Sequence, residues 1–336
     1  MTRAFITGIT GFVGSHLCDY LLANTDWELY GLVRWRSSLN NLQQHLGRIE
    51  KQDRLFLING DLRDSVSLDH ALQKAKPDYV FHLAAQSFPK TSFDSPIDTL
   101  DTNILGTGRL LECIDYAGLG MSTKIHVCAS SEVFGRVSQA ELPIGEDCRF
   151  HPASPYAISK VGTDLIGRFY AEAYGMNVQT TRMFTHTGPR RGDVFAESNF
   201  AKQIAMMERG LIEPYIKVGN LKSMRTWADV RDAVRAYHML LMVDPKPGAY
   251  YNIGGDYSCT IGDMLDTLLS MSHIRPTIVE DLERLRPIDA DLQVPDTSKF
   301  RKHTGWEPRI KFKQTMKDLL DYWRAEVIRQ RPVLYR

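Results

Sequence analysis

Residues 5–16 read FITGITGFVGSH, and this stretch decides the fold. Three glycines, Gly8, Gly11 and Gly14, stand three residues apart between an apolar run and the helical pattern GSHLCDYLLAN. Glycine at the first position permits a tight turn, at the second it lets backbone N–H groups approach an anion, and at the third it lets the helix pack closely on its strand. The stretch therefore predicts a first β–α unit with an anion at the helix N-terminus.

The same alternation of strand-like and helical patterns continues through the first half of the chain. Further apolar runs are WELYGLVR (27–34), RLFLINGDL (54–62), YVFHLAAQ (79–86) and KIHVCASS (124–131), with helical patterns between them. Strands that are apolar throughout are buried on both faces, as in a parallel sheet covered by helices. We expect an α/β fold with a Rossmann-like, doubly wound parallel sheet.

The rhythm loosens beyond about residue 175, where helical patterns mix with short strand-like runs such as VQTTRMF and YYNIGG. This change predicts a smaller α+β substrate-binding region packed against the carboxyl ends of the strands. We assign residues 1–175 to a dinucleotide-binding domain that carries the catalytic residues. Residues 176–336 are expected to be mainly substrate-binding, with the chain crossing back between the two parts.

Composition excludes several classes of protein. The 336 residues include 41 Lys and Arg against 40 Asp and Glu, a formal net charge of +1, so we expect no nucleic-acid partner. No apolar stretch is long enough to span a membrane, and the N-terminus lacks the form of a signal peptide. The five scattered cysteines indicate free thiols in a reducing compartment, and no metal site is expected. We expect a soluble cytoplasmic protein.

The end of the second apolar run bears on the choice of dinucleotide. NAD-binding proteins usually place a carboxylate there to hold the ribose 2′-hydroxyl, about twenty residues after the glycines. This chain has Arg34, Arg36 and Ser37 instead, and a guanidinium can bind a 2′-phosphate. We therefore expect NADP, with NAD less favoured; the alternative is that these arginines are solvated loop residues. Asp61 and Leu62 suit the adenine, and residues 83–87 end the fourth run beside the same ligand.

The stretch HPASPYAISK (151–160) places Tyr156 and Lys160 on one face of a helix that Ser154 can cap. A phenol has a pKa of about 10, and a nearby ammonium would lower it, which would make the phenolate a base for a hydroxyl proton. In CASSEVFG (128–135), Glu132 follows two hydroxyls at a strand end. A carboxylate there is suited to proton transfer; the alternative is that it only hydrogen-bonds nearby backbone.

Arginines recur in three motifs of the second half, GPRRG (Arg190, Arg191), KSMRTW (Arg225) and LRPID (Arg286). Any one of them could be ordinary surface charge. Three such loops beside glycine and proline turns together suggest a diphosphate site.

The glycine triplet, Asp61-Leu62, HLAAQS, SSE and the Tyr156/Lys160 spacing resemble those of extended short-chain dehydrogenases/reductases that modify nucleotide sugars, over nearly the whole chain. GLVRWRSS, LAAQS, GPRRGDVF, VGNLKSMRTW, and RPIDADLQVPDTSK before TGWEP resemble GDP-mannose 4,6-dehydratases more closely. GDP-4-keto-6-deoxymannose reductases share several marks, including SSE and VGNL. Two departures from the dehydratase pattern are Thr185 in place of Asn and Ser130 in place of Thr.

The resemblance implies a role for each matching residue. Implied catalytic residues are Ser130, Glu132, Tyr156 and Lys160. Implied cofactor contacts are Gly8, Thr10, Gly11, Phe12, Val13, Gly14, Arg34, Arg36, Ser37, Asp61, Leu62, Leu83, Ala84, Ala85, Gln86, Ser87, Tyr156, Lys160, His186 and Arg191. Implied substrate contacts are Ser131, Thr185, Asn199, Arg225 and Arg286.

The function that the resemblance implies is that of a GDP-sugar 4,6-dehydratase acting on GDP-mannose or a GDP-heptose, as a homodimer or homotetramer. The first alternative is a GDP-4-keto-6-deoxymannose reductase or GDP-sugar C4 dehydrogenase. The second is a non-catalytic NADP-binding relative.

Overall fold

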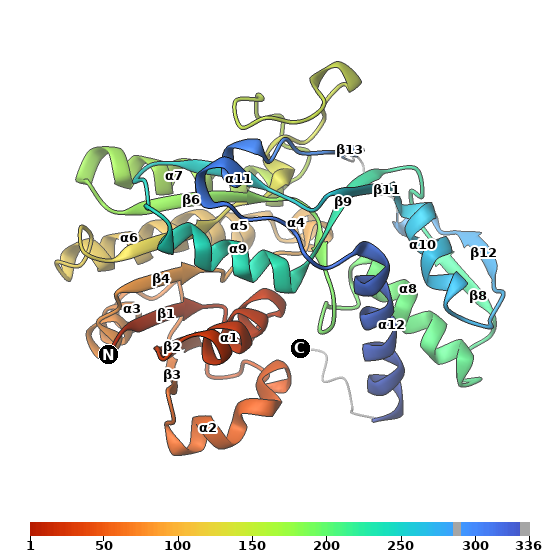
Figure 1. The fold of residues 1–336 in the computed structure, drawn as a ribbon, viewed down its shortest axis with the longest axis horizontal. Helices are drawn as coiled ribbons and strands as arrows, with labels where there is room; N and C mark the ends of the chain where they lie inside the picture. The colour runs from red at the N-terminus through yellow and green to blue at the C-terminus, as the bar shows by residue number, and fades with distance from the viewer. Residues whose placement is uncertain (285–289, 330–336) are drawn as a thin grey trace.

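The computed structural model describes residues 1–284 and 290–329 (Figure 1). Its centre is a seven-stranded sheet in the order β10-β6-β5-β4-β1-β2-β3, and all neighbouring pairs are parallel. The strands are β1 (Arg3–Thr7), β2 (Glu28–Val33), β3 (Leu55–Asn59), β4 (Tyr79–His82), β5 (Lys124–Cys128), β6 (Val178–Met183) and β10 (Tyr250–Ile253). The expected doubly wound parallel sheet is confirmed.

Helices cover both faces of this sheet because its strands are apolar on both sides. On one face, α1 (Phe12–Asn24) and α9 (Val230–Met242) contribute to one core cluster. On the other, α3 (Ser65–Ala75), α6 (Gly106–Tyr116) and α7 (Pro155–Tyr174) contribute to a second. Strand β1 pairs with β2 on one side and β4 on the other, so the chain reverses direction across the sheet there. Ligands of such sheets bind at this point, outside the carboxyl ends of the strands.

A smaller α+β region lies beside these carboxyl ends (Figure 1, right). Its strands are β7 (His186–Thr187), β8 (Tyr215–Val218), β9 (Met224–Asp229), β11 (Tyr257–Thr260), β12 (Thr277–Glu280) and β13 (Leu292–Gln293). Its helices α8 (Ala196–Glu208), α10 (Ile261–Ser270) and α12 (Phe312–Ile328) enclose a separate core. Residues after 175 contribute to both parts of the fold, because β6, α9 and β10 belong to the large sheet and its covering helices.

The remaining helices are short. They are α2 (Leu46–Lys51), α4 (Pro89–Asp94), α5 (Pro96–Leu100) and α11 (Ser298–Thr304), with helical turns at Asn40–His45, Asp101–Leu105, Ser131–Val133, Gln139–Glu141 and Leu282–Arg284. The turn Asp101–Leu105 has π geometry and joins α5 to α6.

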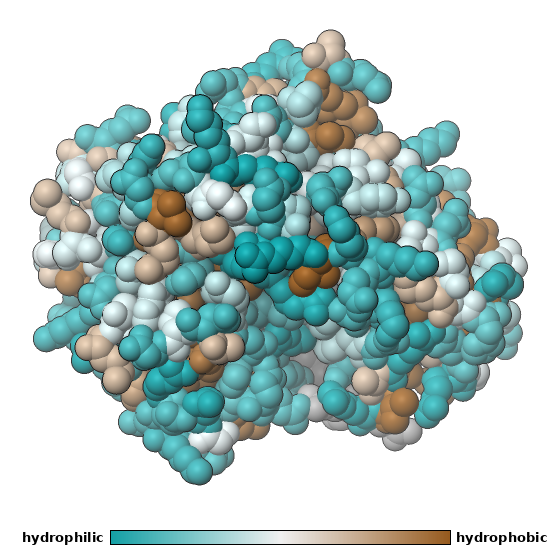
Figure 2. All heavy atoms as spheres, in the orientation of Figure 1, coloured by the Kyte–Doolittle hydropathy of each residue, from teal (hydrophilic) through white to brown (hydrophobic). Residues whose placement is uncertain are grey.

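The surface is mostly hydrophilic on the face drawn in Figure 2, with hydrophobic residues in separate small patches. Within residues 1–284 and 290–329, no helix has both the length and the apolar character that crossing a membrane requires. All five cysteines are free, as expected. Within the same ranges, no group of three or more His, Cys, Asp or Glu side chains is placed to hold a metal ion.

Candidate active site

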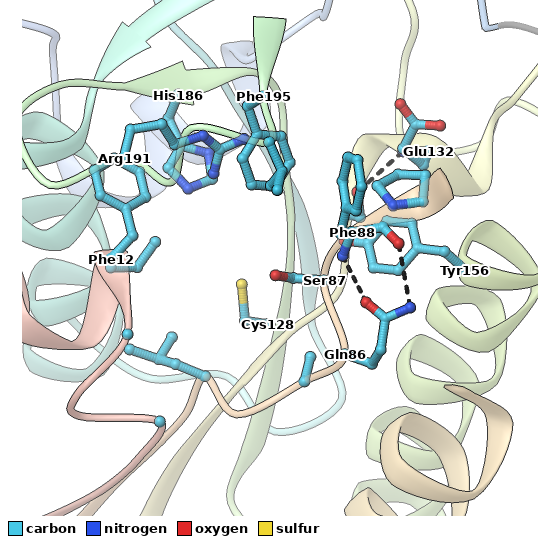
Figure 3. Close-up of a pocket in the computed structure, with 18 of the residues that line it drawn as sticks. Phe12, Gln86, Ser87, Phe88, Cys128, Glu132, Tyr156, His186, Arg191 and Phe195 are labelled. Carbon is cyan, nitrogen blue, oxygen red and sulfur yellow. Dashed lines mark hydrogen bonds between the residues drawn. The ribbon is translucent and has the colours of Figure 1, made fainter. Parts of the chain in front are cut away.

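A cavity of about 950 Å³ lies at the carboxyl ends of the parallel strands and extends to the smaller region. Its wall includes the segments that follow β1 and β4, Cys128 at the end of β5, the start of α7, and the segment that leads into α8. Figure 3 shows Phe12, His186 and Arg191 on one side and Tyr156 and Glu132 on the other. Among the expected site residues that the structure describes, Arg36 and Arg190 do not line this cavity and all the others do. Arg286 lies outside the described residues.

The glycine turn has the shape that a nucleotide cradle requires. Gly8 has φ +74°, a left-handed backbone that favours glycine, and a Cβ there would meet the backbone nitrogen of Ala84 at 2.8 Å. The N–H of Gly11 donates to the carbonyl of Gly8 at 2.9 Å. Helix α1 begins at Phe12 without a side-chain cap, and the residues of its first turn, Phe12, Val13 and Gly14, line the cavity. These features fit the diphosphate of a dinucleotide cofactor.

The two arginines after β2 lie in different places. Arg34 and Ser37 line the cavity, whereas the guanidinium of Arg36 lies 4.7 Å from the ring centroid of the exposed Trp35. Arg34 is therefore placed at the cavity, whereas Arg36 is stacked on a surface tryptophan. Arg63, which the sequence reasoning missed, also lines the cavity and pairs with Asp61.

Tyr156 and Lys160 occupy the first turns of α7, as the spacing predicts. Ser154 caps the helix by accepting from the N–H of Ala157 at 3.0 Å, and Pro155 is its first residue. Both Tyr156 and Lys160 are buried. Both residues also line the cavity.

The pKa of Tyr156 differs from the expectation. Burial raises it well above the ordinary value, and the hydrogen bond with the Ser130 hydroxyl opposes the rise; the Glu132 carboxylate raises it and Arg191 lowers it. The ammonium of Lys160 donates to the Cys128 carbonyl at 2.8 Å, and burial lowers the pKa of that amine. The prediction that Lys160 lowers the phenol pKa is therefore wrong for the protein alone, because desolvation dominates.

Glu132 lies in the turn directly after β5. Its N–H donates to Oγ of Ser130 at 3.2 Å, which orients the backbone of the turn. Its side chain is half-buried and lines the cavity on the same side as Tyr156 (Figure 3). Ser131, between the two, is buried and also lines the cavity. A carboxylate, a phenol and two hydroxyls thus face one space, which is a set suited to proton transfer.

On the opposite wall, the ring of His186 stacks on Phe12 with centroids 5.9 Å apart. Burial, together with the nearby Arg191, lowers the pKa of His186 to about 4, so this imidazole is neutral at neutral pH. Its Nε2 is buried and has no hydrogen-bond partner among the described residues. A buried polar atom of this kind at a cavity wall fits a residue that contacts a polar ligand.

The expected substrate contacts lie toward the smaller region. Asn199 accepts a hydrogen bond from Nη1 of Arg284 at 3.1 Å, and both line the cavity with Arg225 and Thr185. Arg190 does not line it; it pairs with Asp19 of α1 at 2.6 Å. The suggestion that Arg190 joins a diphosphate site is therefore wrong, because this salt bridge holds it against α1.

Sequence reasoning missed Phe88, Phe195, Cys128 and Arg284, which also line the cavity. Phe195 ends the quoted GPRRGDVF and Cys128 begins the quoted CASSEVFG, while Phe88 follows HLAAQS and Arg284 precedes LRPID. Proximity to a motif was a usable signal, but nothing in the local pattern showed which way these side chains point.

The fold, the glycine turn and the Ser-Tyr-Lys set define an extended short-chain dehydrogenase/reductase of the kind that acts on nucleotide sugars. The family model for GDP-mannose 4,6 dehydratase matches residues 5–319, and the chain belongs to that family.

Named relatives have two activities. GDP-mannose 4,6-dehydratase from Vibrio cholerae is 33% identical, with 94% of this chain and 92% of the relative covered. GDP-6-deoxy-D-mannose reductase from Pseudomonas aeruginosa is 32% identical, with 97% and 98% covered.

Solved structures agree on the fold. RMD from Pseudomonas aeruginosa complexed with NADPH has a TM-score of 0.81 at 30% identity, covering 97% of this chain and all of that chain. DesIV, a dTDP-glucose 4,6-dehydratase from Streptomyces venezuelae with NAD and TYD bound, has a TM-score of 0.82 at 26% identity, covering 98% and 99%.

Proposed function

We propose that this protein is a GDP-sugar 4,6-dehydratase that converts GDP-mannose or a GDP-heptose to the 4-keto-6-deoxy sugar. The observation that carries the proposal is that Glu132 faces the same cavity as Ser130, Tyr156 and Lys160, in a chain whose GLVRWRSS and GPRRGDVF motifs resemble those of the dehydratases. An enzyme that only oxidises or reduces C4 needs the last three residues, whereas elimination of water needs a further acid–base group.

Oxidation at C4 begins with removal of the hydroxyl proton. Tyr156 takes this proton as its base, and the Ser130 hydroxyl, which faces the same cavity, holds the C4 oxygen. Lys160, bound to the Cys128 carbonyl, fixes the first turns of α7 against the end of β5. A bound nicotinamide supplies the hydride acceptor and, when oxidised, a positive charge that favours the phenolate.

Elimination follows because the C4 ketone makes the C5 hydrogen acidic. Glu132 removes that proton and returns a proton to the C6 hydroxyl, which leaves as water. The hydride from C4 then adds to C6, and a proton adds to C5. Carbon 4 is oxidised, carbon 6 is reduced and one water is lost, so no external oxidant or reductant is consumed.

The chain's own residues can hold a dinucleotide at the glycine turn, along residues 83–87 and between His186 and Arg191. Arg34 and Ser37 at the end of β2 favour NADP over NAD, because a guanidinium attracts a 2′-phosphate. The relative RMD is complexed with NADPH, whereas DesIV is bound to NAD.

A second candidate is a reductase of the 4-keto-6-deoxy sugar, favoured by the similarity to the GDP-6-deoxy-D-mannose reductase. The two are separated by incubating the purified protein with GDP-mannose, and in parallel with a GDP-heptose, without added reductant. We expect a 4-keto-6-deoxy product by NMR and mass spectrometry. If neither GDP-mannose nor the GDP-heptose is converted, and a 4-keto sugar is consumed when NADPH is added, the protein is a reductase and the dehydratase proposal fails.

We further propose a homodimer or homotetramer in the cytoplasm. Large apolar side chains are exposed along α7 and the end of α6, namely Ile158, Leu165, Phe169, Tyr174 and Tyr116. Such a face supports association of identical copies. The five free thiols support a reducing compartment. Light scattering of the purified protein and fractionation of cells test these two points.

A further inference from the structure

Two phenylalanines meet across the cavity. The rings of Phe88 and Phe195 lie 5.6 Å apart between centroids, at an interplanar angle of 74°. Phe88 directly precedes α4 in the loop after β4, and Phe195 directly precedes α8 in the smaller region. Both side chains are half-buried and line the cavity. The contact therefore joins the wall of the sheet layer to the wall of the smaller region (Figure 3).

The loop that carries Phe88 is fixed by its neighbour Gln86. The Gln86 amide accepts from the N–H of Phe88 at 2.6 Å and donates to its carbonyl at 3.1 Å. Asn103 in turn binds both backbone groups of Gln86, at 2.8 and 2.9 Å. The Asn103 amide also donates to Ser159 of α7 at 2.8 Å. This chain of hydrogen bonds connects the backbone of Phe88 to the helix that carries Tyr156.

A second connection joins the same loop to the catalytic helix directly. The N–H of Tyr156 donates to Oγ of Ser92 at 3.0 Å, and Ser92 donates to the carbonyl of Pro89, the residue after Phe88. Phe88 thus has a fixed relation to Tyr156, and Figure 3 shows it on the Tyr156 and Glu132 side of the cavity.

Phe195 is held from the other side. The Arg191 guanidinium lies 3.4 Å from its ring centroid and pairs with Glu197 at 3.1 Å. A cation over an aromatic face and a buried ion pair together restrict where this ring can point.

We propose that Phe88 and Phe195 form an aromatic clasp that closes the sugar end of the cavity and retains the 4-keto intermediate until the hydride is returned to C6. The inference rests on the proposed dehydratase function. Between C4 oxidation and hydride return, the sugar is a ketone that water can hydrate and that can dissociate. Two apolar rings exclude water there and offer the intermediate no alternative hydrogen-bond partner. The phenylalanines are positioning residues, and they take no part in proton transfer.

The test is the fraction of turnover that is lost as non-dehydrated 4-keto sugar. GDP-mannose is incubated with the protein, released ketones are trapped with borodeuteride, and the sugars are analysed by mass spectrometry. Absorbance at 340 nm is followed in parallel, because a lost intermediate leaves reduced cofactor behind. We expect F88A and F195A each to raise both signals by about tenfold, with a KM change below about threefold.

Three further variants make the test specific. F88Y keeps the aromatic ring and is expected to stay near the wild-type signals. The double variant F88A/F195A is expected to release little more 4-keto sugar than either single variant, because each single substitution already removes the same contact. Phe93 on α4 is partly exposed and is not among the cavity residues, so F93A is the matched control and is expected to behave as wild type.

A fall in kcat without extra released ketone in both F88A and F195A, or unchanged behaviour of both, overturns the clasp. If wild type dehydrates GDP-mannose and the variants do not leak, only the clasp fails. If wild type forms no 4-keto-6-deoxy product from any GDP-sugar, the proposed function fails and the clasp fails with it. Thermal unfolding of each variant identifies a loss of fold. If an alanine variant has lost its fold, the comparison of F88Y with wild type tests the clasp instead.

Discussion

The ammonium of Lys160 donates a hydrogen bond to the backbone carbonyl of Cys128 at 2.8 Å. This contact joins α7, which carries the phenol, to the end of β5, which leads into Ser130 and Glu132. The lysine therefore aligns the helix that carries Tyr156 with the segment that carries Ser130 and Glu132. Burial, together with Cys128 and Glu132, raises the pKa of Tyr156, so in the proposed mechanism a bound oxidised cofactor would supply positive charge that favours the phenolate.

Tyr156→Phe removes the proposed base and leaves the ring that fills the site. We expect kcat to fall by a factor on the order of 10²–10⁴, with no reduced cofactor formed, because C4 oxidation itself is blocked. The thermal unfolding midpoint is expected to stay within a few degrees of wild type. Activity retained in this variant, measured by product analysis, would support the non-catalytic relative instead.

Glu132→Gln keeps the size of the side chain and removes the carboxylate. Elimination is expected to slow by a factor on the order of 10²–10⁴, while C4 oxidation continues and reduced cofactor accumulates at 340 nm. Glu141, whose carboxylate caps a short turn and is not among the cavity residues, provides the control Glu141→Gln, which should turn over normally. Unaltered 4-keto-6-deoxy product in Glu132→Gln contradicts the elimination role.

Arg34→Ala and Arg36→Ala form a matched pair that tests cofactor choice. Only Arg34 lines the cavity, while Arg36 stacks on Trp35. Loss of a charge-assisted contact to the 2′-phosphate costs about 1.5–3 kcal/mol, so Arg34→Ala should weaken NADP binding by roughly 10- to 150-fold and leave NAD binding unchanged. Arg36→Ala should change neither. Calorimetric titration of both cofactors into each variant measures this, and equal effects of the two variants would reject the assignment.

Two buried histidines predict how stability depends on pH. Burial lowers the pKa of His82 and of His126 to about 3, with His82 and Lys160 adding to the effect on His126. The unfolded chain binds protons at a pKa of about 6.5, so between these values it holds more protons than the folded chain. Stability is therefore full above about pH 6.5 and falls as the pH drops toward 3, by up to ~1.4 kcal/mol per unit for each histidine.

Urea unfolding at pH 7, 6 and 5 measures this slope. A His82→Asn/His126→Asn double variant is expected to be less stable at pH 7 and to show a shallower dependence on pH. An identical slope in wild type and double variant would show that other groups control the acid sensitivity.

The sequence alone was sufficient for the parallel sheet, the order of strands and helices in the first half, and the position of the helix that carries Tyr156 and Lys160. These features depend on local patterns: apolar runs for strands buried on both faces, glycine where Gly8 needs a left-handed backbone, and Ser154 and Pro155 where α7 begins. Each of these preferences acts within a few residues, so the sequence states it directly.

Only the tertiary structure decided which charged side chains share the cavity and what surrounds them. Arg34 and Arg36 look alike in the sequence but differ in place, and Arg190 is held by Asp19 from a helix 171 residues away along the chain. Desolvation of Tyr156 and the contact between Phe88 and Phe195 likewise depend on segments far apart in sequence. Burial and side-chain direction depend on all neighbours in space, and a local sequence pattern does not specify those neighbours.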